Sequence, residues 1–281
     1  MARTRIRCWG VRGSIAAPGR NTAYFGGNTT CFEIEHGVTR IICDAGTGIR
    51  ALGLDLKRRF GKRPIEALIL MSHVHWDHYI GLPFFAPIYN DKNRFTIAGP
   101  RIMGMDFPGV IRDAIRPPYF PISTAEFKAK VEFINLGMNE YEFGDVRIIA
   151  HEAHHPQGSC GWRFFFPGGR SAVIMTDNEP RGAADELALV EFMKNADVLI
   201  HDAQYAPKGY AKRFGWGHSP YTYAVGLAGA ACVRRLFLAH FDPEDDDAVL
   251  KKVLADAKSF AKKTRCAASV SMAREGAVIE L

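Results

Sequence analysis

Four histidine and aspartate side chains follow directly after an apolar segment of the sequence. Residues 65–72 (IEALILMS) precede His73, His75, Asp77 and His78, which form the pattern H-x-H-x-D-H. Alternate residues of an extended chain point the same way, so His73 and His75 can bind one ion. A turn then brings Asp77 and His78 to a neighbouring position, so that one short segment supplies ligands to two adjacent ions. Nitrogen and oxygen ligands of these types are typical of zinc sites.

Polar residues of the same types end other apolar segments of the chain. Asp44, Asp177, Asp202 and His240 each close a predicted strand, namely TRIICD, SAVIMTD, DVLIHD and RLFLAH. Strands that deliver such residues to a common edge build a site there. We therefore predict one α/β domain over residues 1–281, with helices outside two packed sheets.

The other segments alternate strand and helix patterns. RIRCWG and TCFEIE predict early strands, and GWRFFFP with SAVIMTD predicts a hairpin. Helices are expected near residues 51–60 and 183–194, after Ser219-Pro220, and from Asp242-Pro243 to about Lys263. Residues 101–129 are expected to be rich in loops, and GAVIEL at 276–281 is expected to be the last strand.

Composition and charge narrow the class of protein. The 281 residues are 47% hydrophobic and 23% charged, as in soluble globular proteins. The net charge of +6 fits an anionic substrate, but the cationic residues are scattered, which argues against nucleic-acid binding. No apolar run is long enough for a membrane span or a signal peptide. The six cysteines form no CxxC pair and are expected to be reduced core thiols of a cytoplasmic protein, and His36 is expected to be solvated.

Several further motifs accompany the histidine cluster: GVRGS (10–14), GGNTT (26–30), DAGTG (44–48), HPQGSCGWR (155–163), TDNE (176–179), HDAQY (201–205), GWGHS (215–219) and LAHFDP (238–243). Together they resemble the metallo-β-lactamase-fold hydrolases over nearly the whole chain. The resemblance is to the phosphodiesterase-like branch, which includes the cyclic-phosphate phosphodiesterase of phosphonate metabolism and ribonuclease Z. It implies an αββα sandwich of two mixed β-sheets flanked by helices, with a dinuclear metal site at the sheet edge.

The resemblance also implies a ligand set for two divalent ions. It assigns His73, His75 and His155 to the first metal, Asp77, His78 and His240 to the second, and Asp177 to both. Zinc is favoured, with manganese or iron as alternatives. Within HEAHHP, His155 is thus the expected ligand, whereas His151 is a structural neighbour and His154 a bystander.

Catalysis at such a site would use a hydroxide that bridges the two metals. His218 in GWGHSP is the candidate general acid, because it lies in a Gly-flanked loop just before a helix. Asp202 would pair with His218 and keep it charged. Asp77 completes the predicted catalytic set, and Asp44 is expected to orient a ligand.

Weaker candidates lie in turns. Ser14 and Asn28 are candidates for contacts near the site, and Tyr119 and Phe120 for a lid or an aromatic wall, although a packed proline-rich loop explains the latter pair as well. His201 is expected to be structural.

The favoured function is hydrolysis of a small, anionic phosphodiester, such as a cyclic nucleotide or cyclic ribose phosphate. Hydrolysis of a lactone, ester or C–N bond is the alternative. Cleavage at tRNA 3′ ends is disfavoured because only residues 156–176 separate His155 from Asp177, which leaves no room for a tRNA-binding arm. No membrane partner is expected, nucleic acid is disfavoured, and a homodimer is compatible with the sequence.

Overall fold

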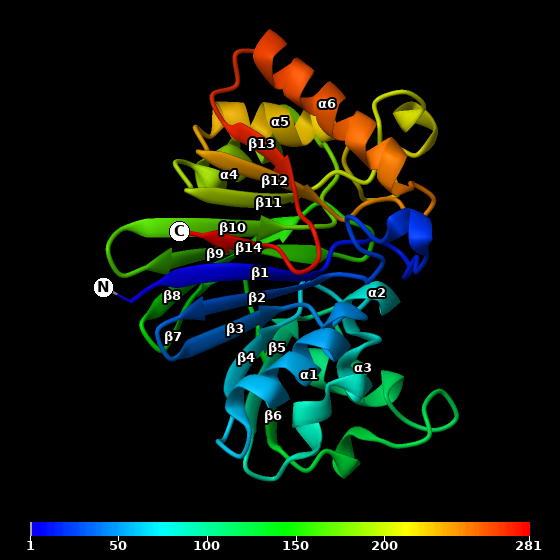
Figure 1. The fold of residues 1–281 in the computed structure, drawn as a ribbon, viewed down its shortest axis with the longest axis vertical. Helices are drawn as coiled ribbons and strands as arrows, with labels where there is room; N and C mark the ends of the chain where they lie inside the picture. Colours follow the sequence, from blue (N-terminus) through cyan, green and yellow to red (C-terminus); the bar gives the residue numbers. More distant parts are fainter. Residues whose placement is uncertain (1) are drawn as a thin grey trace.

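The computed structural model describes residues 2–281, which form two seven-stranded sheets (Figure 1). The first sheet has the order β14-β1-β2-β3-β4-β5-β6, and the second has the order β13-β12-β11-β10-β9-β8-β7. Each sheet is antiparallel on one side and parallel on the other, with the change at β3 and at β10. The predicted pair of mixed sheets is confirmed.

The strands of the first sheet are β1 (Thr4–Gly10), β2 (Cys31–His36), β3 (Thr39–Cys43), β4 (Glu66–Leu70), β5 (Arg94–Pro100), β6 (Lys130–Leu136) and β14 (Val278–Glu280). Those of the second are β7 (Glu140–Phe143), β8 (Val146–Ala153), β9 (Ser159–Phe166), β10 (Arg170–Met175), β11 (Val198–Asp202), β12 (Arg235–Ala239) and β13 (Ser269–Met272). The predicted hairpin is β9 and β10, which pair in antiparallel register.

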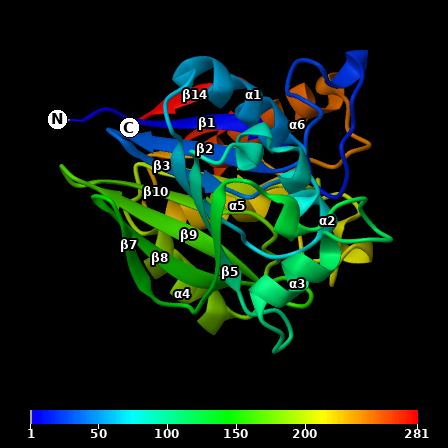
Figure 2. The ribbon, with the colours of Figure 1, turned by 90° about the horizontal axis from the view of Figure 1, so that it is seen from below.

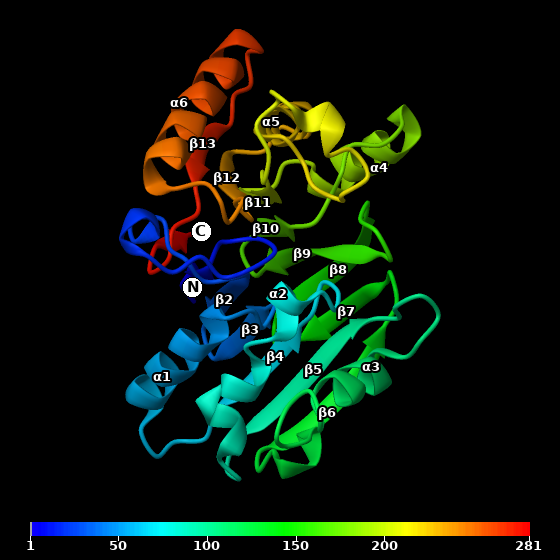
Figure 3. The same cartoon turned by 90° about the vertical axis from the view of Figure 1, so that its right-hand side faces the viewer.

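Helices cover the outer faces of both sheets. α1 (Gly48–Phe60) and α3 (Phe107–Ala114) lie against the first sheet, as the view from below shows (Figure 2). α4 (Ala183–Met193), α5 (Tyr221–Ala230) and α6 (Asp247–Lys263) lie on the side of the second sheet. The short α2 (Trp76–Tyr79) lies at the edge of the sandwich that faces the viewer in Figure 3. This is the αββα arrangement that the sequence predicts.

The inner faces of the two sheets share one apolar core. Ile6 of β1 belongs to the same buried cluster as Phe164 of β9 and Leu238 of β12. A second cluster fills the space beneath α1 and α3. Side chains alternate along a strand, so Ile41 of β3 joins the first cluster and Ile42 the second. Burying each such side chain stabilises the fold by about 1.5–3 kcal/mol.

Residues 101–129 are rich in loops, as predicted, and they also contain α3, which begins where Asp106 accepts a hydrogen bond from the Gly109 amide. Two expectations about helices need correction. The last long helix begins at Asp247, capped by Asp246, and not at Asp242-Pro243. Ser219 precedes α5 but does not cap it, because its hydroxyl donates to the carbonyl of Asn178 instead. Where two polar residues lie close together, the local sequence does not show which of them caps the helix.

Two expectations about burial are also wrong. His36 is buried at the end of β2, where Nδ1 lies 2.7 Å from the Thr4 hydroxyl and the ring stacks on Phe166. Cys232 is exposed, whereas Cys8, Cys31, Cys43 and Cys160 are buried, and all are free thiols. Within residues 2–281, no helix has both the length and the apolar character to cross a bilayer.

Candidate metal centre

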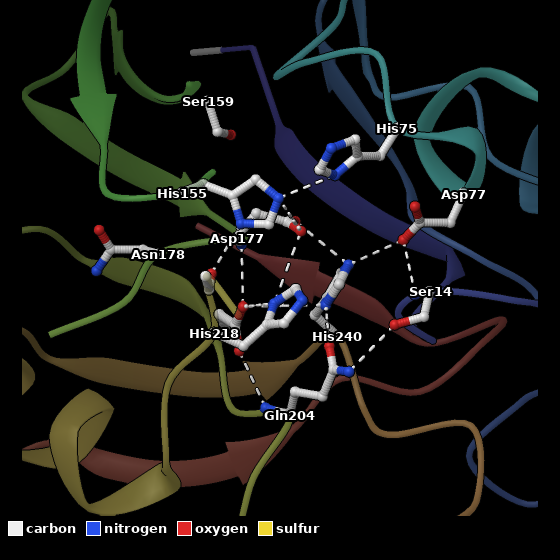
Figure 4. A network of polar contacts seen from close by, with 12 residues as sticks. Ser14, His75, Asp77, His155, Ser159, Asp177, Asn178, Gln204, His218 and His240 are labelled. Atoms are coloured by element: carbon white, nitrogen blue, oxygen red, sulfur yellow. Dashed lines mark hydrogen bonds and ion pairs between the residues drawn. The ribbon is translucent and has the colours of Figure 1, made fainter. Parts of the chain in front are cut away.

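Four of the candidate ligands lie just beyond the ends of strands. His73 follows β4, His155 follows β8, Asp177 follows β10 and His240 follows β12. All four are buried, although each carries a polar side chain. The strands end at one edge of the sandwich, where the side chains of His155, Asp177 and His240 converge (Figure 4), and His73 lies in the same groups of potential ligand atoms.

The backbone at these strand ends has an uncommon conformation. Asp44, Asp177 and His240 have φ angles of 60°, 54° and 57°, in the left-handed region, and Ser14 nearby has 62°. Residues other than glycine enter this region rarely, and they do so preferentially at functional sites. At these three strand ends the chain turns sharply, and no pattern in the sequence indicates this.

The first group of ligand atoms comes from three histidines. The ring nitrogens of His73, His75 and His155 lie within 4.8 Å of one another. Nε2 of His155 is 2.9 Å from Nδ1 of His75. His75 is the residue before α2, and His155 reaches the same point from the other sheet.

The second group contains one carboxylate and two imidazoles. Asp77 Oδ2 lies 3.2 Å from Nε2 of both His78 and His240. The two Nε2 atoms are 3.3 Å apart, and both histidine side chains are buried. The single helical turn α2 thus points Asp77 and His78 towards His240. In the sequence, His240 lies 162 positions after His78.

The Asp177 carboxylate lies between the two groups. Its Oδ2 is 3.2 Å from Nε2 of His78 and of His240. Its Oδ1 faces the other group, 3.9 Å from Nε2 of His73 and 3.8 Å from Nε2 of His155. A carboxylate in this position can offer one oxygen to each of two ions.

Two buried atoms of the cluster have no hydrogen-bond partner among residues 2–281: Nε2 of His73 and Oδ2 of Asp177. Buried polar atoms without partners are rare because the lost hydration costs free energy. A divalent cation would satisfy both atoms. The residues present therefore fit two ions, in keeping with nitrogen and oxygen donors that suit Zn²⁺, Mn²⁺ or Fe²⁺.

Hydrogen bonds outside the centre fix which ring nitrogen is free. Nδ1 of His155 donates to the Gly217 carbonyl at 2.9 Å, and Nδ1 of His78 donates to Asp44 at 2.9 Å. Nδ1 of His240 donates to Gln204 Oε1 at 3.0 Å. In each ring Nε2 then keeps its lone pair and points to the centre, as in many metal sites. The position of Asp44 matches its predicted orienting role.

In His75 it is the other ring nitrogen that is held by a hydrogen bond outside the centre. Its Nε2 lies 2.7 Å from Gln157 Oε1, so Nδ1 is the nitrogen left for an ion. Sequence reasoning missed both Gln157 and Gln204. Their amide side chains look like ordinary turn residues in HPQG and HDAQ, and only the fold brings them to the histidines.

His218 and Asp202 form a pair at the same edge. His218 Nδ1 is 2.8 Å from Asp202 Oδ2, and Asp202 also accepts from the Ser219 amide. His218 lines a hollow of about 370 Å³ together with Asp77, Asp177 and Ser14. Asp77 and His218 of the predicted catalytic set therefore face one space, whereas Asp202 is buried behind His218, and Nε2 of His218 is the free ring nitrogen.

The remaining candidates divide into near and distant ones. The Ser14 amide donates to Asp77 Oδ2 at 2.8 Å, so Ser14 lies at the centre. The Asn28 side chain donates to Glu275 instead, which is a contact away from the ligand groups. His151 packs on Phe192.

The other two histidines of this part of the chain are also held elsewhere. His154 Nδ1 lies 3.3 Å from the Glu179 carbonyl, and His201 Nδ1 lies 2.7 Å from the Asp202 carbonyl. His201 is buried and is in none of the groups of potential ligand atoms, which fits its predicted structural role.

The charges of the centre shift the pKa values of its members. Burial lowers the pKa of His73 well below its usual value, and the His78 charge lowers it further. Burial also opposes the charged form of His240, but Asp177 and Asp77 outweigh it and raise its pKa to about 9. Burial raises the pKa of Asp177, whereas His240 and His78 lower it, with a net value well below normal. A bound cation would replace such protons, since only the neutral imidazole is a ligand.

Comparison with known proteins agrees with this geometry. Residues 39–241, more than two thirds of the chain, match the family described as the beta-lactamase superfamily domain. A ribonuclease Z from Brevibacillus brevis is 37% identical over 114 residues, which cover 38% of this chain and only 34% of that protein. The chain thus matches about a third of that relative's length.

Two comparisons extend over all or nearly all of the chain. A ribonuclease Z from Picrophilus torridus is 24% identical, with 91% of each protein covered. The metallo-beta-lactamase fold protein YhfI from Bacillus subtilis has a similar structure, with a TM-score of 0.72, 18% identity and 100% of both chains covered.

Proposed function

The chain belongs to the beta-lactamase superfamily, and we propose that it is a metal-dependent hydrolase that cleaves a small phosphodiester. The observation that carries this proposal is the position of His218. Its ring is held by Asp202 and faces the hollow that Asp77 and Asp177 line. An alkoxide leaving group needs a proton, and a charged imidazole at this position can supply it.

We assign the ligands as two sets with a shared carboxylate. His73, His75 and His155 would hold one ion, Asp77, His78 and His240 the other, and Asp177 both; the interatomic distances and the two unpartnered atoms support this. We favour Zn²⁺, with Mn²⁺ or Fe²⁺ as alternatives. When bound, two such ions lower the pKa of a shared water and neutralise charge on the phosphate.

The chain's own residues then complete the hydrolysis. Asp77 and Asp177 fix where the attacking water lies relative to phosphorus. The water oxygen bonds to phosphorus, the bond to the leaving oxygen breaks, and its electron pair stays on that oxygen. His218 gives its Nε2 proton to the leaving oxygen, and Asp202 stabilises the charged ring beforehand. The proton lost by the water restores His218, so the net reaction consumes one water.

The proposal is tested with the purified protein loaded with Zn²⁺ or Mn²⁺. We expect hydrolysis of bis-p-nitrophenyl phosphate and of cyclic mononucleotides, and slower or no hydrolysis of lactones. Turnover of lactones with no turnover of any phosphodiester would support the C–O hydrolase alternative and overturn ours.

The ligand assignment has its own test in Asp177→Ala. We expect elemental analysis to find about two ions in the wild-type chain and less than about one in the variant, because the shared carboxylate is lost. The variant should also lose most activity. A fully loaded, active Asp177→Ala protein would remove Asp177 from the centre.

Cleavage of tRNA precursors is a second candidate, because two relatives are named ribonuclease Z. The segment between His155 and Asp177 contains only the β9–β10 hairpin, so a long arm is absent from that place in the described residues. Incubation of the metal-loaded protein with a tRNA precursor decides between the two. Efficient cleavage at the 3′ end would favour the ribonuclease.

A further inference from the structure

An apolar cavity of about 590 Å³ opens beside the hollow of the metal centre. Trp76 lines both spaces, so they are neighbours that share one side chain. The volume lies in the range of about 300–1,000 Å³ that is common for small-molecule sites. Such a space next to a hydrolytic centre can hold the part of a substrate that does not react.

One wall of the cavity comes from the segment that supplies two proposed ligands. Within the single turn of α2, Asp77 and His78 are buried towards the metal centre, whereas Trp76 faces outward. The following short helix, Leu82–Phe84, continues this wall with Phe84. The cavity and the centre are therefore held in a fixed relation by one short stretch of backbone.

The opposite wall comes from the end of α3 and the loop after it. Ile115, Tyr119 and Phe120 line this side. The rings of Phe84 and Phe120 meet edge to face, with centroids 5.6 Å apart, and join the two walls. The sequence left open whether Tyr119 and Phe120 form a lid, an aromatic wall or a packed proline-rich loop; both side chains line this cavity.

The lining is unusually exposed for large apolar side chains. Trp76 is 74% exposed, Tyr119 75% and Phe84 53%. Single exposed apolar residues are ordinary, but a cluster of them around a cavity marks a binding site. A hydrocarbon group that covers these side chains would remove their apolar surface from water, which is favourable in free energy.

No Lys or Arg lines either the cavity or the adjoining hollow in the described part of the chain. Proteins that bind RNA neutralise several phosphates with such side chains. Here the metal centre is the place for one anionic group, and apolar surface lies beside it. The combination suits an amphiphilic ligand with one charge.

We propose that the cavity binds a hydrocarbon ester group, so that the substrate is a phosphodiester with one large alkyl or aryl substituent. This inference rests on the proposed phosphodiesterase function, which puts the phosphate at the metal centre. The substituent then passes Trp76 and covers Phe84 and Tyr119. A nucleobase is a poorer occupant because its polar edges would lose water with few hydrogen bonds in return.

The test measures binding of methyl-, butyl-, hexyl- and octylphosphonate to the Zn²⁺-loaded protein by calorimetry. All four carry the same anionic group, so only the chain length changes. We expect the Kd to fall with each methylene, by up to about fourfold per group, and by more than about tenfold from methyl to hexyl. A Kd that does not depend on chain length overturns the proposal.

Substitutions of cavity residues test whether the alkyl chain binds in the cavity. In Phe84→Ala and Tyr119→Ala we expect the Kd for hexylphosphonate to rise by about fivefold or more, with a smaller rise for methylphosphonate. Leu187→Ala is the matched control, because Leu187 is 71% exposed on α4 and lines neither space. An equal dependence on chain length in all three variants places the hydrocarbon elsewhere and contradicts the proposal.

Adenosine 5′-phosphate provides the competing ligand. Tighter binding of this nucleotide than of hexylphosphonate, lost in Phe84→Ala, would make the cavity a base site and overturn the inference. Hydrolysis of bis-p-nitrophenyl phosphate is measured on the same preparation. If bis-p-nitrophenyl phosphate is not hydrolysed but the Kd of the phosphonates still depends on chain length, only the proposed function is contradicted. If it is hydrolysed but the Kd does not depend on chain length, only the hydrocarbon site is contradicted.

Discussion

At the scale of single residues, the centre depends on which nitrogen each histidine presents. The donor bonds from Nδ1 of His155, His78 and His240 leave three Nε2 atoms turned inward. His75 is held through Nε2 by Gln157 and presents Nδ1 instead. Such outer contacts orient ligands and affect metal affinity about 10- to 100-fold when removed. The contact that each histidine makes outside the centre therefore decides which of its ring nitrogens faces the centre.

We predict that His155→Ala and His154→Ala behave differently. His155→Ala should lose most metal from the first group, because its Nε2 lies among the ligand atoms. His154→Ala should keep its metal, because His154 contacts the Glu179 carbonyl and not the centre. Elemental analysis of both proteins after gel filtration checks this. The reverse result would exchange the two assignments.

We also predict that the effect of His218→Ala depends on the leaving group. Esters with alkoxide leaving groups should slow by about 10²–10⁴-fold, because their departure needs an acid. Esters of p-nitrophenol should slow much less, since the phenolate leaves without a proton. The ratio of kcat values for the two ester types is the measurement. Equal slowing would mean that His218 positions substrate and donates no proton.

At the scale of elements, a network of charges joins α1 to the first sheet. Arg59 of α1 bonds to Glu33 of β2 at 2.6 Å and to Glu35 at 2.7 Å. Arg40 of β3 bonds to the same two carboxylates. Glu33 is fully buried, so its charge depends on these partners. The network therefore stabilises the contact between α1 and the first sheet. Strands β3 and β4 of this sheet end near the metal centre.

We predict that Arg59→Met lowers the free energy of unfolding by about 2–3 kcal/mol, because it removes a partner from a buried carboxylate. Arg58→Met is the control. Arg58 is exposed and bonds only to Asp55 in the described chain, so its loss should cost less than about 1 kcal/mol. Urea unfolding followed by circular dichroism measures both. Similar losses in the two variants would show that the buried carboxylate does not depend on Arg59.

At the scale of the whole molecule, the two sheets depend on each other. Ile6 and Ile34 of the first sheet belong to one buried cluster with Phe164 and Ile200 of the second. The centre likewise takes His73 from one sheet and His155, Asp177 and His240 from the other. We therefore propose that residues 1–281 are one domain, because neither sheet has a complete core or a complete site alone.

One domain should unfold in one step. In EDTA, urea unfolding followed by far-ultraviolet dichroism and by tryptophan fluorescence should give coincident transitions. Added Zn²⁺ should raise the midpoint, because ions bind the folded centre. Two separated transitions would show that the sheets unfold as independent units.

The sequence predicted the sandwich and proposed the candidate ligands, in part through the resemblance of its motifs to the metallo-β-lactamase-fold hydrolases. Apolar runs that end in Asp or His, and the spacing of His73 to His78, are local patterns, and local geometry decides what they can bind. Sequence reasoning misplaced the start of α6, where Asp242 and Asp246 are both possible caps and Asp246 is the one that caps the helix, and it did not predict α3.

Tertiary structure decided the rest. Gln157 reaches His75 across 82 positions and the Gly217 carbonyl reaches His155 across 62, so neither contact leaves a local pattern. The cavity beside Trp76 likewise needs Phe84 and Phe120 to meet. Short-range spacing therefore marks His73, His75, Asp77 and His78 as candidate ligands, whereas their orientation and the space beside them arise only when distant segments pack together.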